Sequence, residues 1–391
     1  MEKEVLLKNG SDLVYLVRCA LRGESPASTA VEGMDPEAVH ALAKRHSMAA
    51  ISAYAMERYC KENPDSPAAQ HPVMEQWRQE KASAIRKNLM LDMEREKILT
   101  HLEQIGCWYM PLKGVYMQHI YPRAGMRQMS DNDILIDPAY RKAVQSYMEQ
   151  SGYEPHSVGE SIHDAYMKKP LYNFEMHIAP LGSVDHPGRA AYYETVREKL
   201  IKDPENGFGY HFTDEDFYIY MHTHAAKHYE SGGNGIRSLM DVYQYLSQKG
   251  ETLDRNYIDR EMEKLELTGY VSMAENLAEK LFGGTQPLTE QEREQFLYHI
   301  TSGTYGTWQG RIDNGMKRYA TEDGKVTAWS KFRYILRRLY PNREFYQYRM
   351  PLVYKYRILM PFAAIYRLIV KVFTVFPKIV GEVKTVWKRE K

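Results

Sequence analysis

The sequence predicts an α+β fold, in which a small mixed sheet forms a core inside a mostly helical chain. Apolar residues recur at helical spacing before residue 106 and again after residue 212. Between these positions, short aliphatic and aromatic runs separated by turn residues are typical of strands. We therefore expect four regions: a helical region at 1–94, a mixed α/β core at 95–205, a helical region at 206–330 and a basic, aromatic-rich helical segment at 331–391.

The N-terminal region shows three helical patterns. Residues 4–22 carry apolar side chains on one helical face. Asp35-Pro36-Glu37 combines an N-cap acid, a first-turn proline and a first-turn carboxylate, so a second helix is expected to begin there. Residues 72–105, rich in Glu, Lys, Arg, Met and Leu, predict one long helix.

At Gly106 the pattern changes from helical to extended. Strands are expected at 107–112, 131–136, 163–167 and 171–178, the last two as a hairpin. Helices are expected at 115–121 and at 138–152, where Gly152 marks the end. After the core, Thr213-Asp214-Glu215-Asp216 predicts a capped helix start. Further helices are expected at 236–246, 254–265, 268–282, 289–302, 328–340, 357–376 and 378–388.

Composition is that of an ordinary soluble globular protein. The 52 Lys and Arg residues nearly balance 51 Asp and Glu, so net charge alone does not indicate a nucleic-acid binder. Residues 331–391 differ, with 15 Lys and Arg against 3 Asp and Glu. Three widely spaced cysteines, without a C-x-x-C motif, disfavour disulfides and a zinc site and predict a reducing, cytoplasmic location.

Two carboxylates open the second expected strand. Asp131 and Asp133 are separated by one residue, so in an extended strand both point to the same face. Two adjacent anions stay ionised only when a cation lies between them, and Mg²⁺ takes such oxygen ligands. The plainer alternative is that Asp131-Asn132-Asp133 is a polar turn before the strand.

Other candidate residues surround this pair in the sequence. Glu175, on the later hairpin, supplies a third carboxylate, and three such groups on neighbouring strands could hold two Mg²⁺ ions. Lys113-Gly114 could approach phosphate oxygens, and so could Arg127. The structural alternatives are that Lys113 caps a strand end at the surface, that Arg127 pairs with Asp131, and that Glu175 is solvated.

These residues belong to a longer pattern, Leu112-Lys113-Gly114, Tyr121-Pro122, Gly125-Met126-Arg127, Ser130-Asp131-x-Asp133-Ile134-Leu135-Ile136 and Gly152-Tyr153. The pattern resembles the uncharacterised bacterial nucleotidyltransferase family of the DNA polymerase β-like superfamily. Two later runs, His224-Ala225-Ala226-Lys227-His228 and Arg237-Ser238-Leu239-Met240-Asp241-Val242, are similar to that family's helical pattern. The resemblance spans roughly residues 40–300.

The resemblance implies a minimal nucleotidyltransferase core that uses Mg²⁺ and transfers a nucleoside monophosphate from an NTP with release of pyrophosphate. By position, Asp131, Asp133 and Glu175 would be the catalytic metal ligands, with Glu175 also a possible general base. Lys113 and Gly114 would occupy the nucleotide loop, where the superfamily usually has Gly-Ser or Gly-Gly. Glu175 stands where Asp is more usual.

A second group of candidates lies in the helical region. His224, Lys227 and His228 share one helix face, which could bind a metal through the two histidines. We favour a helix lining the cleft, with Lys227 and Arg237 directed at phosphates. Asp241 would orient one of these cations. His177 lies on the same strand face as Glu175 and could touch the site, but we favour a hydrogen-bonded structural histidine.

The basic C-terminal segment mixes cationic and aromatic residues: Phe332, Arg333, Tyr334, Arg337, Arg338, Tyr340, Arg343, Phe345, Tyr346, Tyr348, Arg349, Tyr354, Lys355, Tyr356 and Arg357. Such a segment could bind a nucleic acid, lie on an anionic membrane surface, or pack on the acidic part of its own chain.

The sequence therefore predicts a Mg²⁺-dependent nucleotidyltransferase acting on a hydroxyl of a protein side chain, an RNA end or a small molecule. The alternative is a non-catalytic module that keeps the fold and binds a nucleotide or a partner. The residues expected to bind the nucleotide are Lys113, Gly114, Arg127, Ser130, Lys227 and Arg237.

Overall fold

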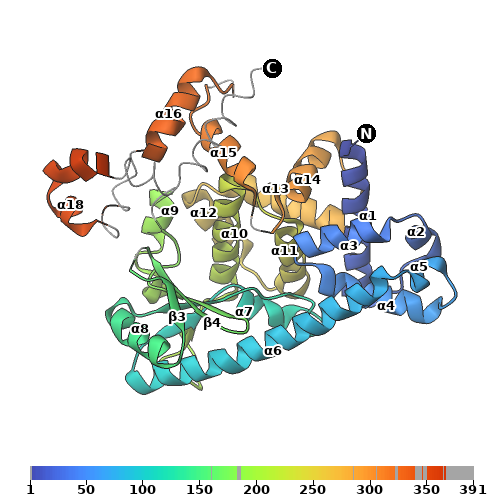
Figure 1. Cartoon of the computed structure of the whole chain (residues 1–391), viewed down its shortest axis with the longest axis horizontal. Coiled ribbons are helices and arrows are strands. Elements are labelled where there is room, and N and C mark those ends of the chain that lie inside the picture. The colour runs from blue at the N-terminus through green and yellow to red at the C-terminus, as the bar shows by residue number, and fades with distance from the viewer. Residues whose placement is uncertain are drawn as a thin grey trace.

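The computed structural model describes residues 2–159, 161–182, 186–284, 286–304, 306–321, 325–339, 346, 350–363 and 365–366. Helices surround a mixed five-stranded sheet, and a two-stranded sheet lies beside it (Figure 1). The predicted α+β class is therefore confirmed.

Six helices precede the sheet: α1 (Glu2–Arg22), α2 (Ser28–Glu32), α3 (Pro36–Arg45), α4 (Ala49–Glu62), α5 (Pro67–Gln70) and α6 (Val73–Ile105). The start expected at Asp35 is confirmed, because its side chain accepts a hydrogen bond from the Ala38 amide. Helix α6 ends at Gly106, whose φ of 72° favours glycine. Figure 1 shows α6 running from the N-terminal helices to the sheet, so one rigid element joins both parts.

The main sheet has the order β1-β2-β5-β4-β3, with β2 and β5 parallel and the other pairs antiparallel. Its strands are β1 (Tyr109–Pro111), β2 (Asn132–Ile136), β3 (Glu154–Ser157), β4 (His163–Lys168) and β5 (Tyr172–His177). The expected β4–β5 hairpin is confirmed, whereas the exposed edge strand β3 was not predicted. The intervals contain α7 (Gly114–Met117), the 3₁₀ turns η1 (Gln118–Ile120) and η2 (Pro138–Tyr140), and α8 (Arg141–Gln150).

Strand register decides which polar residues meet. Asp133 on β2 lies opposite Glu175 on β5, although 42 positions separate them in the chain. On the other side of β5, His177 lies opposite His163 of β4. Because paired residues of adjacent strands point to the same face, these four side chains share one face of the sheet.

The chain after the sheet is mostly helical. Its elements are α9 (Pro187–Tyr192), η3 (Val196–Lys199), β6 (Ile201–Lys202), β7 (Tyr210–His211), α10 (Asp214–Ser231), α11 (Ile236–Lys249), α12 (Arg255–Lys264), α13 (Thr268–Ala278), the π-helical turn η4 (Glu279–Gly283), α14 (Glu290–Ser302), α15 (Trp308–Lys317), α16 (Ala328–Leu339), α18 (Pro351–Lys355) and η5 (Arg357–Leu359). The helices expected up to residue 340 are present, while α9, α15 and the small sheet were not predicted. The helix expected at 378–388, and 367–376 of the preceding one, lie outside the described residues.

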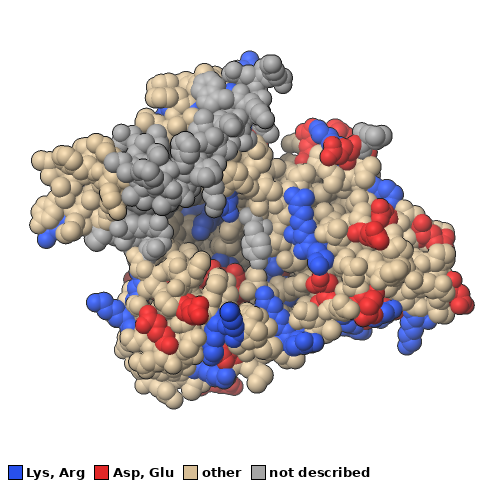
Figure 2. All heavy atoms as spheres, in the orientation of Figure 1, with Lys and Arg blue, Asp and Glu red and all other residues tan. Residues whose placement is uncertain are grey.

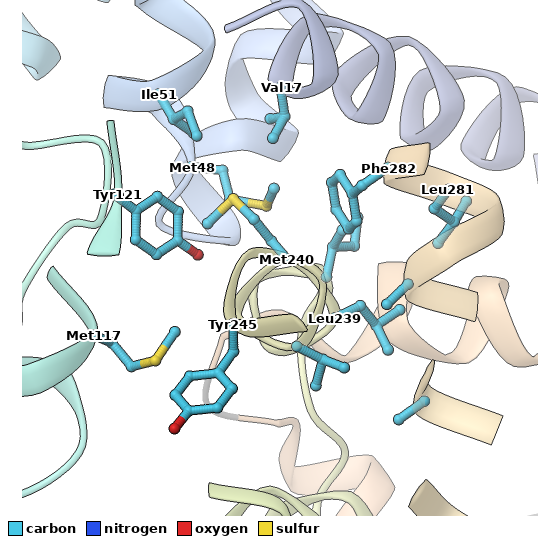
Figure 3. Packing of buried hydrophobic residues seen from close by; sticks show 14 of the residues in the cluster. Val17, Met48, Ile51, Met117, Tyr121, Leu239, Met240, Tyr245, Leu281 and Phe282 are labelled. Atoms are coloured by element: carbon cyan, nitrogen blue, oxygen red, sulfur yellow. The ribbon is translucent and has the colours of Figure 1, made fainter. Parts of the chain in front are cut away.

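The largest hydrophobic cluster joins the N-terminal helices to helices that follow the sheet (Figure 3). Val17 of α1 and Met48 just before α4 belong to the same buried cluster as Met240 of α11 and Phe282 of η4. A second cluster lies between the sheet, α6 and α8. The four expected regions stay a prediction, but the first and third of them contribute to one core. Among the described residues, no helix is both long enough and apolar enough to cross a membrane.

Candidate functional site

A cleft of about 400 Å³ lies between the sheet and the helices α10 and α11. This volume lies within the usual range of small-molecule sites. Every residue predicted to bind metal or nucleotide lines the cleft: Lys113, Gly114, Arg127, Ser130, Asp131, Asp133, Glu175, Lys227 and Arg237. The fold thus brings together residues from segments far apart in the sequence.

Three carboxylates lie at the sheet side of the cleft. Asp131, Asp133 and Glu175 each offer an oxygen, and these oxygens lie within 4.8 Å of one another. Asn132, between the two aspartates, points to the opposite face of the sheet, because successive side chains of a strand alternate. It is fully buried and accepts a hydrogen bond from Arg95. Ser130 donates its hydroxyl to Asp131 at 3.0 Å and so fixes that carboxylate. A converging set of oxygens is the donor chemistry that Mg²⁺ prefers, so these residues fit that cation.

Lys113 contacts the triad directly. Its Nζ lies 2.8 Å from Oδ2 of Asp133, and only 20% of its side chain is exposed. The alternative of a surface strand cap is therefore wrong. Burial by itself would lower the pKa of Lys113, but Asp133, Tyr220 and Asp131 together outweigh burial and raise it. Lys113 also has a φ of +43°, a backbone conformation that costs free energy in a residue other than glycine.

The pKa values of the two aspartates shift in opposite directions, because Asp133 receives hydrogen bonds from Lys113 and His177 whereas the charge of Lys113 offsets the effects on Asp131 only in part. Burial favours the neutral form of Asp133, yet Lys113 and His177 hold its pKa well below the usual value. For Asp131, burial and the nearby negative charge of Asp133 raise the pKa. The site therefore contains one firmly ionised aspartate and one whose charge is opposed by its surroundings.

His177 lines the cleft and contacts the triad, which the sequence offered as the less favoured of two interpretations. Its Nε2 lies 3.3 Å from Oδ1 of Asp133 and 3.5 Å from Oε2 of Glu175. Burial would lower the pKa of the imidazole, but hydrogen bonds to these two carboxylates raise it. The same contact lowers the pKa of Glu175. The two-residue spacing from Glu175 had predicted that both side chains lie on one strand face.

One interpretation expected Arg127 to pair with Asp131, but Arg127 pairs with Asp241 instead. It donates from Nε and Nη2 to Asp241 at 2.9 and 3.0 Å, and Tyr121 donates to the same carboxylate at 2.7 Å. The partner expected for Asp241 was Lys227 or Arg237, whereas the structure gives it two hydrogen bonds from Arg127. A Cβ on Gly114 would lie 2.7 Å from Nη1 of Arg127, so packing against this arginine requires glycine there.

Helices α10 and α11 form the opposite wall. Nε2 of His224 and Nε2 of His228 are 3.1 Å apart. Burial lowers the pKa of His228 to about 4 and that of His224 well below its usual value, so both imidazoles are neutral at pH 7. Arg237 donates to the Gln128 carbonyl at 3.0 Å. Lys227 and Arg237 bring positive charge to the cleft from the side facing the carboxylates.

The C-terminal segment is described only in part. Of its expected contact residues, Tyr340, Arg343, Phe345, Tyr348 and Arg349 lie outside the described residues, as do the side chains of Arg337 and Arg338. Arg333 lies over the ring of Tyr319 at 5.0 Å, so this cation stacks on an aromatic residue of its own chain.

A family described as an uncharacterised nucleotidyltransferase matches residues 32–283. The chain belongs to this nucleotidyltransferase family. The resemblance inferred from the motifs is thus confirmed, and the matched residues include all nine predicted site residues. The family supports nucleotidyl transfer as the general reaction and an NTP as the substrate. Neither a curated protein nor a solved structure matches the chain.

Proposed function

We propose that this protein is a Mg²⁺-dependent nucleotidyltransferase that moves an NMP group from an NTP to an acceptor hydroxyl. One observation carries the proposal: three carboxylate oxygens within 4.8 Å of one another line a cleft that also contains Lys113, Lys227 and Arg237. Asp131, Asp133 and Glu175 hold the metal, which supplies charge stabilisation at the transferring phosphorus. The family match supports the reaction class.

The chain's own residues have distinct roles in this proposal. Lys113 keeps Asp133 ionised and adds positive charge beside the triad. Lys227 and Arg237 face the carboxylates from α10 and α11, so a triphosphate between the two walls would meet cations on both sides. Glu175 is held ionised by His177 and accepts the proton of the acceptor hydroxyl.

Transfer of a labelled NMP tests this proposal. Purified protein is incubated with each α-labelled NTP, Mg²⁺ and three acceptor classes: protein, RNA and small-molecule hydroxyls. We expect label in one acceptor and a matching amount of pyrophosphate, both lost with Asp131→Ala or Asp133→Ala. Nucleotide binding without pyrophosphate release would instead support a non-catalytic nucleotide-binding module.

A second proposal concerns the basic C-terminal segment, which we propose contacts an anionic membrane surface. Four apolar side chains in its described part, those of Leu352, Ile358, Phe362 and Ile365, are between 58% and 81% exposed. Three of the four, Leu352, Ile358 and Ile365, are aliphatic and cannot stack on bases, so next to cations they suit a lipid interface. We expect the full chain to float with vesicles containing phosphatidylserine and not with neutral vesicles, and Ile358→Glu to abolish flotation. Equal recovery with single-stranded RNA would instead indicate a nucleic-acid partner.

A further inference from the structure

A second group of potential metal ligands lies next to the carboxylate triad. His163, Glu175 and His177 each offer a ligand atom, and these atoms lie within 4.8 Å of one another. The backbone itself sets this grouping, because His163 pairs with His177 across β4 and β5 and Glu175 precedes His177 by two positions. All three side chains therefore project from the same face of the sheet into the cleft, whose lining includes them.

The separations suit a transition metal. Nε2 of His163 lies 3.8 Å from Oε2 of Glu175, and Nε2 of His177 lies 3.5 Å from the same oxygen. Ligands bound at 2.0–2.2 Å around one ion lie roughly 3–3.5 Å from each other. Shifts of a few tenths of an ångström would bring each imidazole nitrogen to that separation from Oε2 of Glu175.

The histidine at the centre of the group is buried and faces anions. Only 5% of His177 is exposed, and its Nε2 contacts one oxygen of Asp133 and one of Glu175. A metal binds the neutral imidazole, so a cation at Nε2 would replace the proton that this nitrogen shares with the two carboxylates.

We infer that His163, His177 and Glu175 form a site for a transition metal such as Mn²⁺, Co²⁺ or Zn²⁺, distinct from the oxygen-only Mg²⁺ site of Asp131, Asp133 and Glu175. Imidazole nitrogens suit zinc and later first-row metals, whereas Mg²⁺ prefers oxygen. Glu175 belongs to both sets, so filling one site changes the other. The inference concerns metal binding and holds whether or not the protein transfers a nucleotide.

Titration of the full metal-free chain with Co²⁺ tests the inference, because visible Co²⁺ absorption reports nitrogen ligation. The titration is run without Mg²⁺ and again with Mg²⁺ in excess; because Glu175 is shared, we expect Mg²⁺ to weaken Co²⁺ binding. We expect one bound Co²⁺ with nitrogen ligands, displaced by Zn²⁺. His163→Ala, at a residue whose side chain is one-third exposed, should weaken Co²⁺ binding at least about tenfold, and His163→Gln should do the same.

Three controls separate this site from other histidine and carboxylate sites. His211→Ala removes an exposed histidine that also contacts a carboxylate, Asp203, and should leave Co²⁺ affinity unchanged. His228→Ala should also leave it unchanged, which separates the site from the His224–His228 pair. Asp131→Asn should weaken Mg²⁺ binding more than Co²⁺ binding. Unchanged Co²⁺ affinity in both folded His163 variants would overturn the inference, and so would an equal loss in Asp131→Asn.

Discussion

Two buried ion pairs line the same cleft, and they differ in what surrounds them. In the pair Arg127–Asp241, 9% and 11% of the side chains are exposed; in the pair Lys113–Asp133, 20% and 9%. Asp241 receives two hydrogen bonds from Arg127 and a third from Tyr121. Asp133 instead lies beside two further carboxylates, with one lysine and one histidine in contact.

Arg127–Asp241 has the surroundings of a structural ion pair, and Lys113–Asp133 has those of a candidate functional one. The first pair neutralises its own charges and uses its hydrogen-bonding capacity within the chain. The second is part of a cluster whose like charges oppose one another, as the raised pKa of Asp131 indicates. Retained strain and repulsion in a cleft are typical of functional sites, where binding is favoured over stability.

The largest effect on stability is expected when the ion pair Arg127–Asp241 is broken. Asp241→Asn leaves the buried Arg127 without a compensating charge, so the free energy of unfolding should fall by about 3–5 kcal/mol. Urea denaturation measures this change in the free energy of unfolding. Glu4→Gln, which breaks an exposed pair with Arg293, should change stability by less than about 1 kcal/mol. Equal effects in the two variants would contradict the assignment of Arg127–Asp241 as a structural pair.

Asp133→Asn is expected to affect activity more than stability. Removing a second-sphere partner of a metal costs about 10–100-fold, so losing a direct ligand should lower NMP transfer more than about a hundredfold. Stability should fall less than in Asp241→Asn, because Asp131 remains close to Lys113. Pyrophosphate release and urea denaturation measure the two quantities, with the exposed Asp259→Asn as control. A loss of stability as large as that of Asp241→Asn would remove the distinction between the pairs.

Gly114→Ala tests whether Arg127, bound by Asp241, can move away from an added Cβ. The new Cβ would lie 2.7 Å from Nη1 of Arg127 and 2.9 Å from Sδ of Met129. Because Asp241 fixes Arg127, we expect a loss of about 1–3 kcal/mol in unfolding free energy, typical of overpacking. Gly188→Ala in α9, where a Cβ meets no atom within 4 Å, is the matched control and should be neutral or slightly stabilising. Thermal unfolding compares the two.

The smallest expected effect is that of Asp131→Asn, which should raise the free energy of unfolding where the other substitutions lower it. The pKa of Asp131 is raised in the folded chain, so the folded state binds its proton more tightly than the unfolded state. Stability therefore falls as pH rises from 3.8 through the folded pKa. Asp131→Asn should remove the loss and stabilise the protein at pH 7 by about 1 kcal/mol, while abolishing transfer. The gain should vanish below pH 3.8; a destabilised variant at pH 7 would contradict the proposed repulsion.

Local patterns predicted most elements correctly because they depend on neighbouring residues. Asp35-Pro36 marked the start of α3, and the alternation around Asp131 and Asp133 marked β2 and its polar face. Elements with weak local signals were missed, such as β3, whose four residues are mostly exposed and lack a buried face. Helix α15 was missed as well, because its two glycines and exposed Trp308 obscure the helical pattern.

Short-range sequence patterns were enough to predict the helical and extended segments, the family, and two carboxylates on one strand face. These follow from steric preferences and side-chain periodicity within a few residues. The charged partners became known from the folded chain. Glu175 and His177 lie beside Asp133, and Arg127 binds Asp241, which is 114 positions away. The reason is physical: a buried charge binds whichever partner strand register and helix packing bring within a few ångströms, and local sequence does not encode that distance.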